Sequence, residues 1–123
     1  MLSIGTVVVG VQDLHRAVMF WTQALGYTTK REVKADDDFT ILVPLEGHGA
    51  HLALDISSSP AHQYPRIHLD LYAGDAADQA AEVERLIALG ATRVDWDLYP
   101  ENPDFIVMAD PDGNRFCVID TSA

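Results

Sequence analysis

The clearest alternation of apolar and polar residues along the chain runs from position 66 to position 72. A period of two predicts a β-strand with one buried face, because successive side chains leave the backbone on opposite sides. The apolar face comprises Ile67, Leu69 and Leu71, and the polar face comprises His68, Asp70 and Tyr72. A histidine, an aspartate and a tyrosine in one row indicate a surface that meets water or a ligand.

Two segments have the apolar spacing that predicts an amphipathic helix. Each follows an aspartate that can accept hydrogen bonds from the first free amides, Asp13 or Asp75, and each stops at a glycine, Gly26 or Gly90. We therefore predict helices over 13–25 and 75–89, as the only long helices of the chain. The first apolar stripe comprises Leu14, Ala17, Val18, Trp21 and Leu25, and the second comprises Ala76, Ala80, Val83, Leu86 and Ile87.

The remaining strands complete a pattern that occurs twice. They are predicted over 4–11, 27–33, 39–44, 51–56, 91–96, 105–109 and 115–120, so that each half reads strand, helix, three strands. Short matches accompany this order, since Ala24-Leu25-Gly26 recurs 64 positions on as Ala88-Leu89-Gly90. We predict one domain over 1–123, made of a module at about 1–56, a linker rich in serine and proline at 57–65, and a second module at about 66–123.

The composition and net charge of the chain limit the kinds of molecule that it is expected to bind. A chain of 123 residues with 48% hydrophobic content suits one compact domain, and its net charge of −11 disfavours nucleic acid and anionic membrane surfaces as partners. The same charge would attract a cationic ligand, or would serve solubility alone. No apolar run reaches membrane-spanning length, and the amino terminus does not read as a secretion signal, so we expect a cytoplasmic protein. The single cysteine, Cys117, fits a reducing compartment and leaves no internal disulfide.

Several motifs, taken in order, resemble the vicinal oxygen chelate superfamily, which includes glyoxalases, extradiol dioxygenases and bleomycin-resistance proteins. The similarity is greatest to its glyoxalase-like domain group. The motifs occupy residues 11–14, 20–21 and 24–27 in the first half, and residues 66–71, 89–91 and 110–117 in the second. The resemblance covers essentially the whole chain, and includes Phe116-Cys117 after an Asp-Pro-x-Gly-Asn turn.

The resemblance implies an α+β fold in which two tandem βαβββ modules form a curled eight-stranded mixed sheet around a cleft, with the helices outside. The strand parities agree with it, since the alternate apolar residues can face the helices. The residues left to face the cleft are Thr6, His51, Ala53, Asp55, His68, Asp70, Arg115 and Cys117.

Catalytic relatives hold a divalent metal with His, Glu, His and Glu on the first, fourth, fifth and eighth strands, where the ion polarises substrate oxygens. The first position here is Thr6, a poor neutral ligand, and the eighth is Cys117, whose thiolate suits zinc better than a hard ion. The fifth is His68, as the resemblance implies. The fourth falls near Asp55, with Ala53 and His51 as alternatives. We therefore predict no metal site and no cofactor.

The predicted ligand-binding cleft comprises Thr6, Asp55, His68, Asp70, Trp96, Tyr99 and Cys117. Simpler roles remain open for several of them. His68 can hydrogen-bond to Asp55 or Asp70, and Cys117 can be a small core residue whose pKa only Arg115 would lower. Aromatic loop residues such as Trp96 and Tyr99 also serve as plugs.

Three functions follow from these observations. The first, which we favour, is a protein that binds a small molecule without an intact metal site, as bleomycin-sequestering proteins do. The second is a lyase or isomerase of the glyoxalase type that uses His68, the best catalytic candidate, as a base, with or without zinc on His68, Asp55 and Cys117. The third is a non-catalytic dimerisation module. The resemblance also implies a homodimer, because paired modules in this superfamily usually pack against another subunit.

Overall fold

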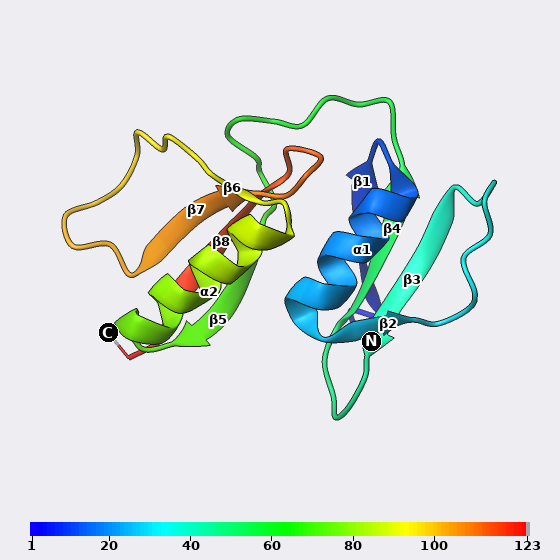
Figure 1. Cartoon of the computed structure of the whole chain (residues 1–123), viewed down its shortest axis with the longest axis horizontal. Coiled ribbons are helices and arrows are strands. Elements are labelled where there is room, and N and C mark those ends of the chain that lie inside the picture. The colour runs from blue at the N-terminus through cyan, green and yellow to red at the C-terminus, as the bar shows by residue number, and fades with distance from the viewer. Residues whose placement is uncertain (123) are drawn as a thin grey trace. The chain divides into compact units, whose positions relative to one another are not determined.

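The computed structural model describes residues 1–122 and confirms the α+β class with two tandem modules (Figure 1). The chain divides into two compact units, Met1–Pro60 and the part that begins at Ala61. Each unit contains a strand, a helix and three further strands, and the eight predicted strands form two four-stranded sheets, one in each unit. None of the helices in residues 1–122 has the length and apolar character needed to cross a membrane.

The first unit is a mixed sheet with one helix on one face. Its elements are β1 (Thr6–Val11), α1 (Leu14–Leu25), β2 (Tyr27–Thr29), β3 (Phe39–Pro44) and β4 (His51–Ile56), with strand order β1-β4-β3-β2. Strands β1 and β4 are parallel, and the other pairs are antiparallel. The buried apolar side chains of the unit are Val11, Leu14, Ala17, Phe20, Trp21, Leu42, Leu52, Ala53 and Leu54.

Both ends of α1 form as predicted. The carboxylate of Asp13 accepts from the Arg16 amide at 3.1 Å, which satisfies one of the amides that a helix start leaves free. Gly26 ends the helix with a φ of 67°, a left-handed conformation in which a side chain would be strained. Phe20, which the predicted stripe left out, is buried beside Trp21, and the two rings meet edge to face.

The second unit repeats this topology with β5 (Leu69–Gly74), α2 (Ala76–Leu89), β6 (Thr92–Arg93), β7 (Phe105–Ala109) and β8 (Arg115–Asp120), in the order β5-β8-β7-β6. Strands β5 and β8 are parallel, and α2 packs across both of them. In Figure 1 this helix lies in front of its sheet. The helix therefore covers one face of the sheet.

Helix α2 is capped as predicted, but its predicted apolar stripe is wrong in part. Asp75 and Asp78 form a reciprocal capping box. Val83 and Leu86 are buried as expected, whereas Ala76, Ala80 and Ile87 are exposed. Gln79 takes the inner position, where its amide Nε2 donates to the carbonyl oxygens of Asp104 and Val118 at 3.0 Å each. These two hydrogen bonds hold Gln79 against the sheet, on the same side of the helix as Val83 and Leu86.

Four predicted strands have the wrong bounds. The strand predicted over 4–11 begins at Thr6, and those over 27–33 and 91–96 end at Thr29 and Arg93. The strand predicted over 66–72 is shifted to Leu69–Gly74. Its first paired residue, Leu69, lies opposite Phe116 near the start of β8, so the chain before it has little neighbouring strand to pair with. The apolar and polar residues alternate from position 66, but the hydrogen-bonded pairing with β8 begins only at Leu69. His68 therefore lies just before the strand.

Candidate functional site

The candidate site lies on the face of the second sheet that is turned away from α2. Phe116 and Val118 of the central strand β8 are buried on the helix side, together with Val83 and Leu86. Side chains alternate along a strand, so Cys117 faces the other way. The register places Asp70 of β5 and Val107 of β7 on either side of Cys117, in one row across the sheet. The sheet itself thus brings residues from three strands together.

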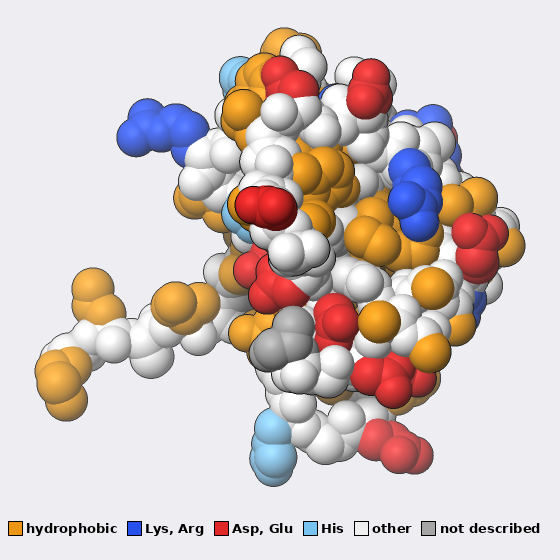
Figure 2. All heavy atoms as spheres, turned by 90° about the vertical axis from the view of Figure 1, so that its left-hand side faces the viewer, with side chains coloured by type: hydrophobic (Ala, Val, Ile, Leu, Met, Phe, Trp, Pro, Cys, Tyr) orange, Lys and Arg blue, Asp and Glu red, His pale blue; other side chains and the backbone are white. Residues whose placement is uncertain are grey.

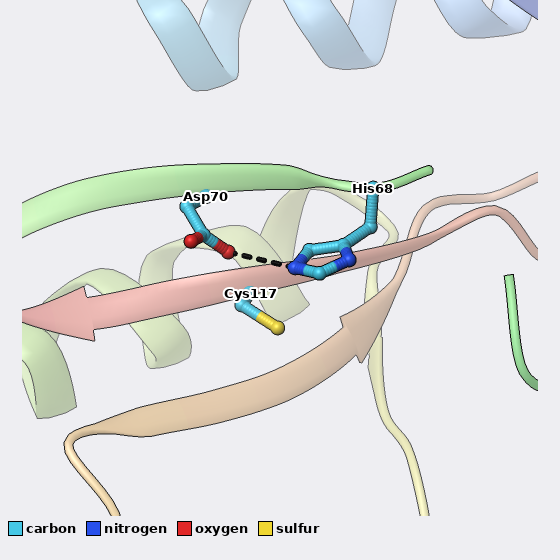
Figure 3. Close-up of side chains that lie close together, drawn as sticks. All are labelled: His68, Asp70 and Cys117. Atoms are coloured by element: carbon cyan, nitrogen blue, oxygen red, sulfur yellow. Dashed lines mark hydrogen bonds and ion pairs between the residues drawn. The ribbon is translucent and has the colours of Figure 1, made fainter. Parts of the chain in front are cut away.

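His68, Asp70 and Cys117 form a compact cluster on this face, and their potential ligand atoms lie within 4.8 Å of one another (Figure 3). The Nε2 atom of His68 lies 3.0 Å from Oδ1 of Asp70, which confirms one of the two hydrogen bonds predicted for this histidine. Both side chains are about half exposed, so as an ion pair the contact contributes little stability. The contact orients the imidazole ring of His68, because Asp70 binds Nε2. The other ring nitrogen, Nδ1, can then face a ligand.

Cys117 is buried, and burial raises the pKa of its thiol to about 11, with a further contribution from the negative charge of Asp70. Arg115, the one residue that was expected to be able to lower this pKa, does not do so. The thiol is therefore neutral near pH 7 and is a poor nucleophile, because the thiolate is the reactive form.

A cavity of about 420 Å³ opens over this cluster, and all of its lining residues belong to the second unit. Four of the predicted site residues line it: His68, Asp70, Trp96 and Cys117. Arg115, which was predicted to face the cleft but was not included in the ligand-binding set, also lines the cavity. Five further lining residues were not predicted: Pro65, Leu98, Phe105, Val107 and Ile119. The parity of β7 and β8 could have indicated most of these, since Phe105 and Val107 alternate along one strand, as do Arg115, Cys117 and Ile119 along the other.

Part of the cavity wall comes from the segment predicted to be a linker. The ring of Tyr64 packs against Trp96 at 5.3 Å, and its hydroxyl donates to Oδ1 of Asp97 at 2.8 Å. The same hydrogen bond raises the pKa of Tyr64. Pro65, the next residue, lines the cavity. Residues 61–65 therefore belong to the second unit, and the only advance signal was an aromatic residue in an otherwise small and polar stretch.

Tyr99 has a structural contact that favours the alternative of a loop anchor. Its hydroxyl accepts from the Val107 amide at 2.8 Å, and its ring packs against Phe105 at 5.2 Å. Both partners are cavity-lining residues of β7, whereas Tyr99 is not among the lining side chains. Tyr99 thus fastens the loop that carries Trp96 and Leu98 to the sheet, and its direct contact with a ligand remains a prediction.

Arg115 is placed in the cavity by the turn that precedes β8. The buried carboxylate of Asp110 accepts from the backbone amides of Asp112 and Asn114 at 3.0 and 2.9 Å, which winds the turn around it. Gly113 has a φ of 89°, and its carbonyl oxygen accepts from Nη1 of Arg115 at 3.0 Å. The turn motif therefore orients a cationic side chain at the first position of β8.

Thr6 and Asp55 belong to the first unit, and their contribution to the same ligand site as His68 remains a prediction. Within their own sheet they lie at different levels. Thr6 is opposite His51, whereas Asp55 is opposite Gly10, four residues further along. Four residues of strand span about 13 Å, too far for both side chains to ligate one ion. Of the three alternatives for the fourth-strand position, His51 is the one level with Thr6.

The metal centre that the superfamily implies does not fit the residues of the second unit. His68 and Asp70 already bond to each other, and the Cys117 thiol holds its proton to a pH of about 11. A hard divalent ion requires nitrogen and carboxylate oxygen donors that converge on one point and are deprotonated. Within residues 1–122, this trio is the cluster whose donor atoms approach one another closely. Three donors of this kind do not reproduce a set of two histidines and two glutamates.

The fold and the position of the site define a class of protein. Tandem βαβββ modules, with polar side chains on the sheet face opposite the helix, are the architecture of the vicinal oxygen chelate superfamily. Within it the chain belongs to the glyoxalase-like domain family, whose model matches residues 6–119. A search of curated proteins found no match.

Solved structures support the fold assignment over nearly the full length. A glyoxalase/bleomycin resistance protein/dioxygenase family enzyme from Burkholderia phytofirmans is 15% identical, with a TM-score of 0.73 over 97% of this chain and 98% of the other. A glyoxalase-related enzyme from Fulvimarina pelagi is 17% identical, with a TM-score of 0.73 over 99% and 90%. The fosfomycin resistance protein FosX of Listeria monocytogenes is 14% identical, with a TM-score of 0.70 over 98% and 91%. Identities this low establish the fold alone.

Proposed function

We propose that this protein binds a small organic molecule in the cavity of its second unit, without a metal ion or cofactor. The observation that carries the proposal is the cavity itself, about 420 Å³ in volume and lined by a few polar groups among mostly apolar side chains. Pockets for small ligands have this character: apolar walls supply affinity and a few fixed polar groups supply orientation.

The apolar part of the cavity lining consists of aromatic and aliphatic side chains. Trp96 and Phe105 offer flat aromatic surfaces, and Leu98 and Ile119 add aliphatic ones. Leu98 is 62% exposed although it is large and apolar, which a bound apolar molecule would offset by removing that surface from water. A ligand with a flat apolar body therefore suits the walls.

A single substitution at the rim tests whether the cavity is the binding site. Leu98→Asp places a charge in the apolar wall, and Leu45→Asp is a matched control, because Leu45 is 65% exposed and lies in the first unit. We expect neutral aromatic amides and alcohols to raise the melting temperature of the parent protein and of Leu45→Asp, but not of Leu98→Asp. Equal stabilisation of all three proteins, or of none, would refute the proposal.

A lyase or isomerase of the glyoxalase type is the second candidate, and the contact between His68 and Asp70 favours it. A carboxylate that holds one ring nitrogen fixes the tautomer and leaves the other nitrogen to take a substrate proton, as general bases require. The test is turnover of the hemithioacetal of methylglyoxal and glutathione, with and without added nickel or zinc. We expect none; activity that His68→Gln abolishes would place the enzyme above the binding protein.

A further inference from the structure

We infer that the ligand of this cavity is an organic monoanion, a carboxylate attached to a flat apolar body, and that the guanidinium of Arg115 binds the carboxylate. The inference rests on the proposed binding function, which it makes more specific. It also reverses the expectation from the net charge of −11, which by itself would favour a cationic ligand.

The guanidinium of Arg115 is incompletely satisfied by the protein. Arginine offers five N–H donors. Nη1 donates to the carbonyl oxygen of Gly113, while Nε is buried and meets no acceptor within residues 1–122. No carboxylate in that part of the chain lies within ion-pair distance of this side chain. A half-buried cation that lines a cavity and lacks a counter-ion is costly unless a ligand supplies one.

The other polar groups of the cavity do not neutralise Arg115. Asp70, the one carboxylate in the lining, is bonded to His68, and the Cys117 thiol is neutral near pH 7. Continuing the register of β5 and β8 by one residue brings His68, a neutral or cationic group, level with Arg115. On the face drawn in Figure 2, acidic side chains are scattered rather than gathered in one place. The lining therefore sums to zero or positive charge within an acidic protein.

These surroundings favour a carboxylate over a phosphate. A carboxylate carries one charge and can accept two parallel N–H bonds from a single guanidinium. A phosphate monoester carries up to two charges, and the nearby Asp70 would repel the second one. The apolar walls at Trp96 and Phe105 then receive the rest of the molecule.

Four naphthalene derivatives with one ring system and different head groups test the inference by titration calorimetry. We expect naphthoate to bind at least about tenfold more tightly than neutral naphthamide, the gain typical of a hydrogen bond to a charged group. Naphthyl phosphate should bind more weakly than naphthoate, and naphthylmethylammonium most weakly. Arg115→Gln should abolish the preference for naphthoate over naphthamide, measured as the ratio of the two affinities in the same variant.

Two control variants separate the guanidinium from net charge and from folding. Arg93→Gln removes one positive charge from an exposed position in the same unit, outside the cavity lining, and should keep the full preference. Arg115→Lys retains the charge without the planar fork and should keep part of it. If Arg115→Gln fails to give the melting temperature and circular dichroism of a folded protein, Arg115→Lys decides the question.

The titrations distinguish a failure of the proposed binding function from a failure of the inference about Arg115. If none of the four probes binds the parent protein, the proposed binding function is refuted. If naphthoate and naphthamide bind equally, or the ammonium probe binds best, the cavity stands as a binding site and the inference about Arg115 is overturned. Unchanged discrimination in Arg115→Gln overturns it as well.

Discussion

Cys117 should resist alkylation because its thiol keeps its proton. Burial and the charge of Asp70 raise its pKa from an ordinary value of 9.0 to about 11. At pH 8 an ordinary thiol with a pKa of 9 is ionised in about one molecule in ten, and Cys117 in about one in a thousand. Since the thiolate is the nucleophile, we expect the rate of reaction with iodoacetamide at pH 8 to be about 100-fold below that of an exposed thiol.

The assay is the rate of carbamidomethylation of the folded protein by mass spectrometry, from pH 7 to pH 11. The pH profile separates ionisation from access, because restricted access lowers the rate equally at every pH, whereas a raised pKa moves the midpoint. Asp70→Asn should lower the midpoint without bringing it to 9, since burial is the larger cause. Asp95→Asn, an exposed aspartate of the same unit, should leave the midpoint in place.

A midpoint at or below pH 9 in the parent protein would contradict this reasoning and would restore the alternative of an activated thiol. The same pKa has a consequence for stability. Above pH 9 the unfolded chain loses the thiol proton while the folded chain keeps it, so the free energy of unfolding falls as the pH rises from 9 toward 11. Cys117→Ala should show a shallower fall over that range, measured by urea denaturation.

Four further outcomes are expected. Chelation by EDTA should leave the melting temperature unchanged, and a stoichiometric zinc ion on His68 and Cys117, lost together with stability, would contradict the metal-free site. Gly26→Ala should cost about 1–2 kcal/mol of unfolding free energy in urea, because an L-residue is strained at a φ of 67°; Gly5→Ala, equally uncrowded, should change it by less than about 0.5 kcal/mol. Trp21→Ala should cost about 3–5 kcal/mol, since Trp21 is only 1% exposed. Light scattering should show a dimer, and a clean monomer across micromolar concentrations would refute it.

The order of elements could be predicted from the sequence because each local signal acts within a few residues. Capping aspartates and terminal glycines set both helices, and the twofold repeat of strand, helix and three strands set the class. The inward placement of Gln79 on α2 could not be predicted in this way. Its amide reaches carbonyl oxygens that are 25 and 39 positions away in the chain.

The site was predicted in part for the same reason. Parity along each strand placed His68, Asp70 and Cys117 on one face, and this holds in the structure. The register of β5 against β8 adds what the parity of a single strand cannot show, namely that Asp70 lies directly opposite Cys117. Which residues of two different strands lie side by side depends on strand pairing, and pairing is a property of the sheet.

The sequence by itself therefore determined the elements, their repeat, the family and the side chains of each strand face, since all of these follow from short-range periodicity and from motifs. The tertiary structure decided which faces enclose a cavity and what surrounds each polar group. Arg115 and Cys117 illustrate the difference, because burial and the absence or presence of a neighbouring carboxylate set their chemistry. Those surroundings come from β5, β7 and two loops, which the chain brings together only when the sheet forms.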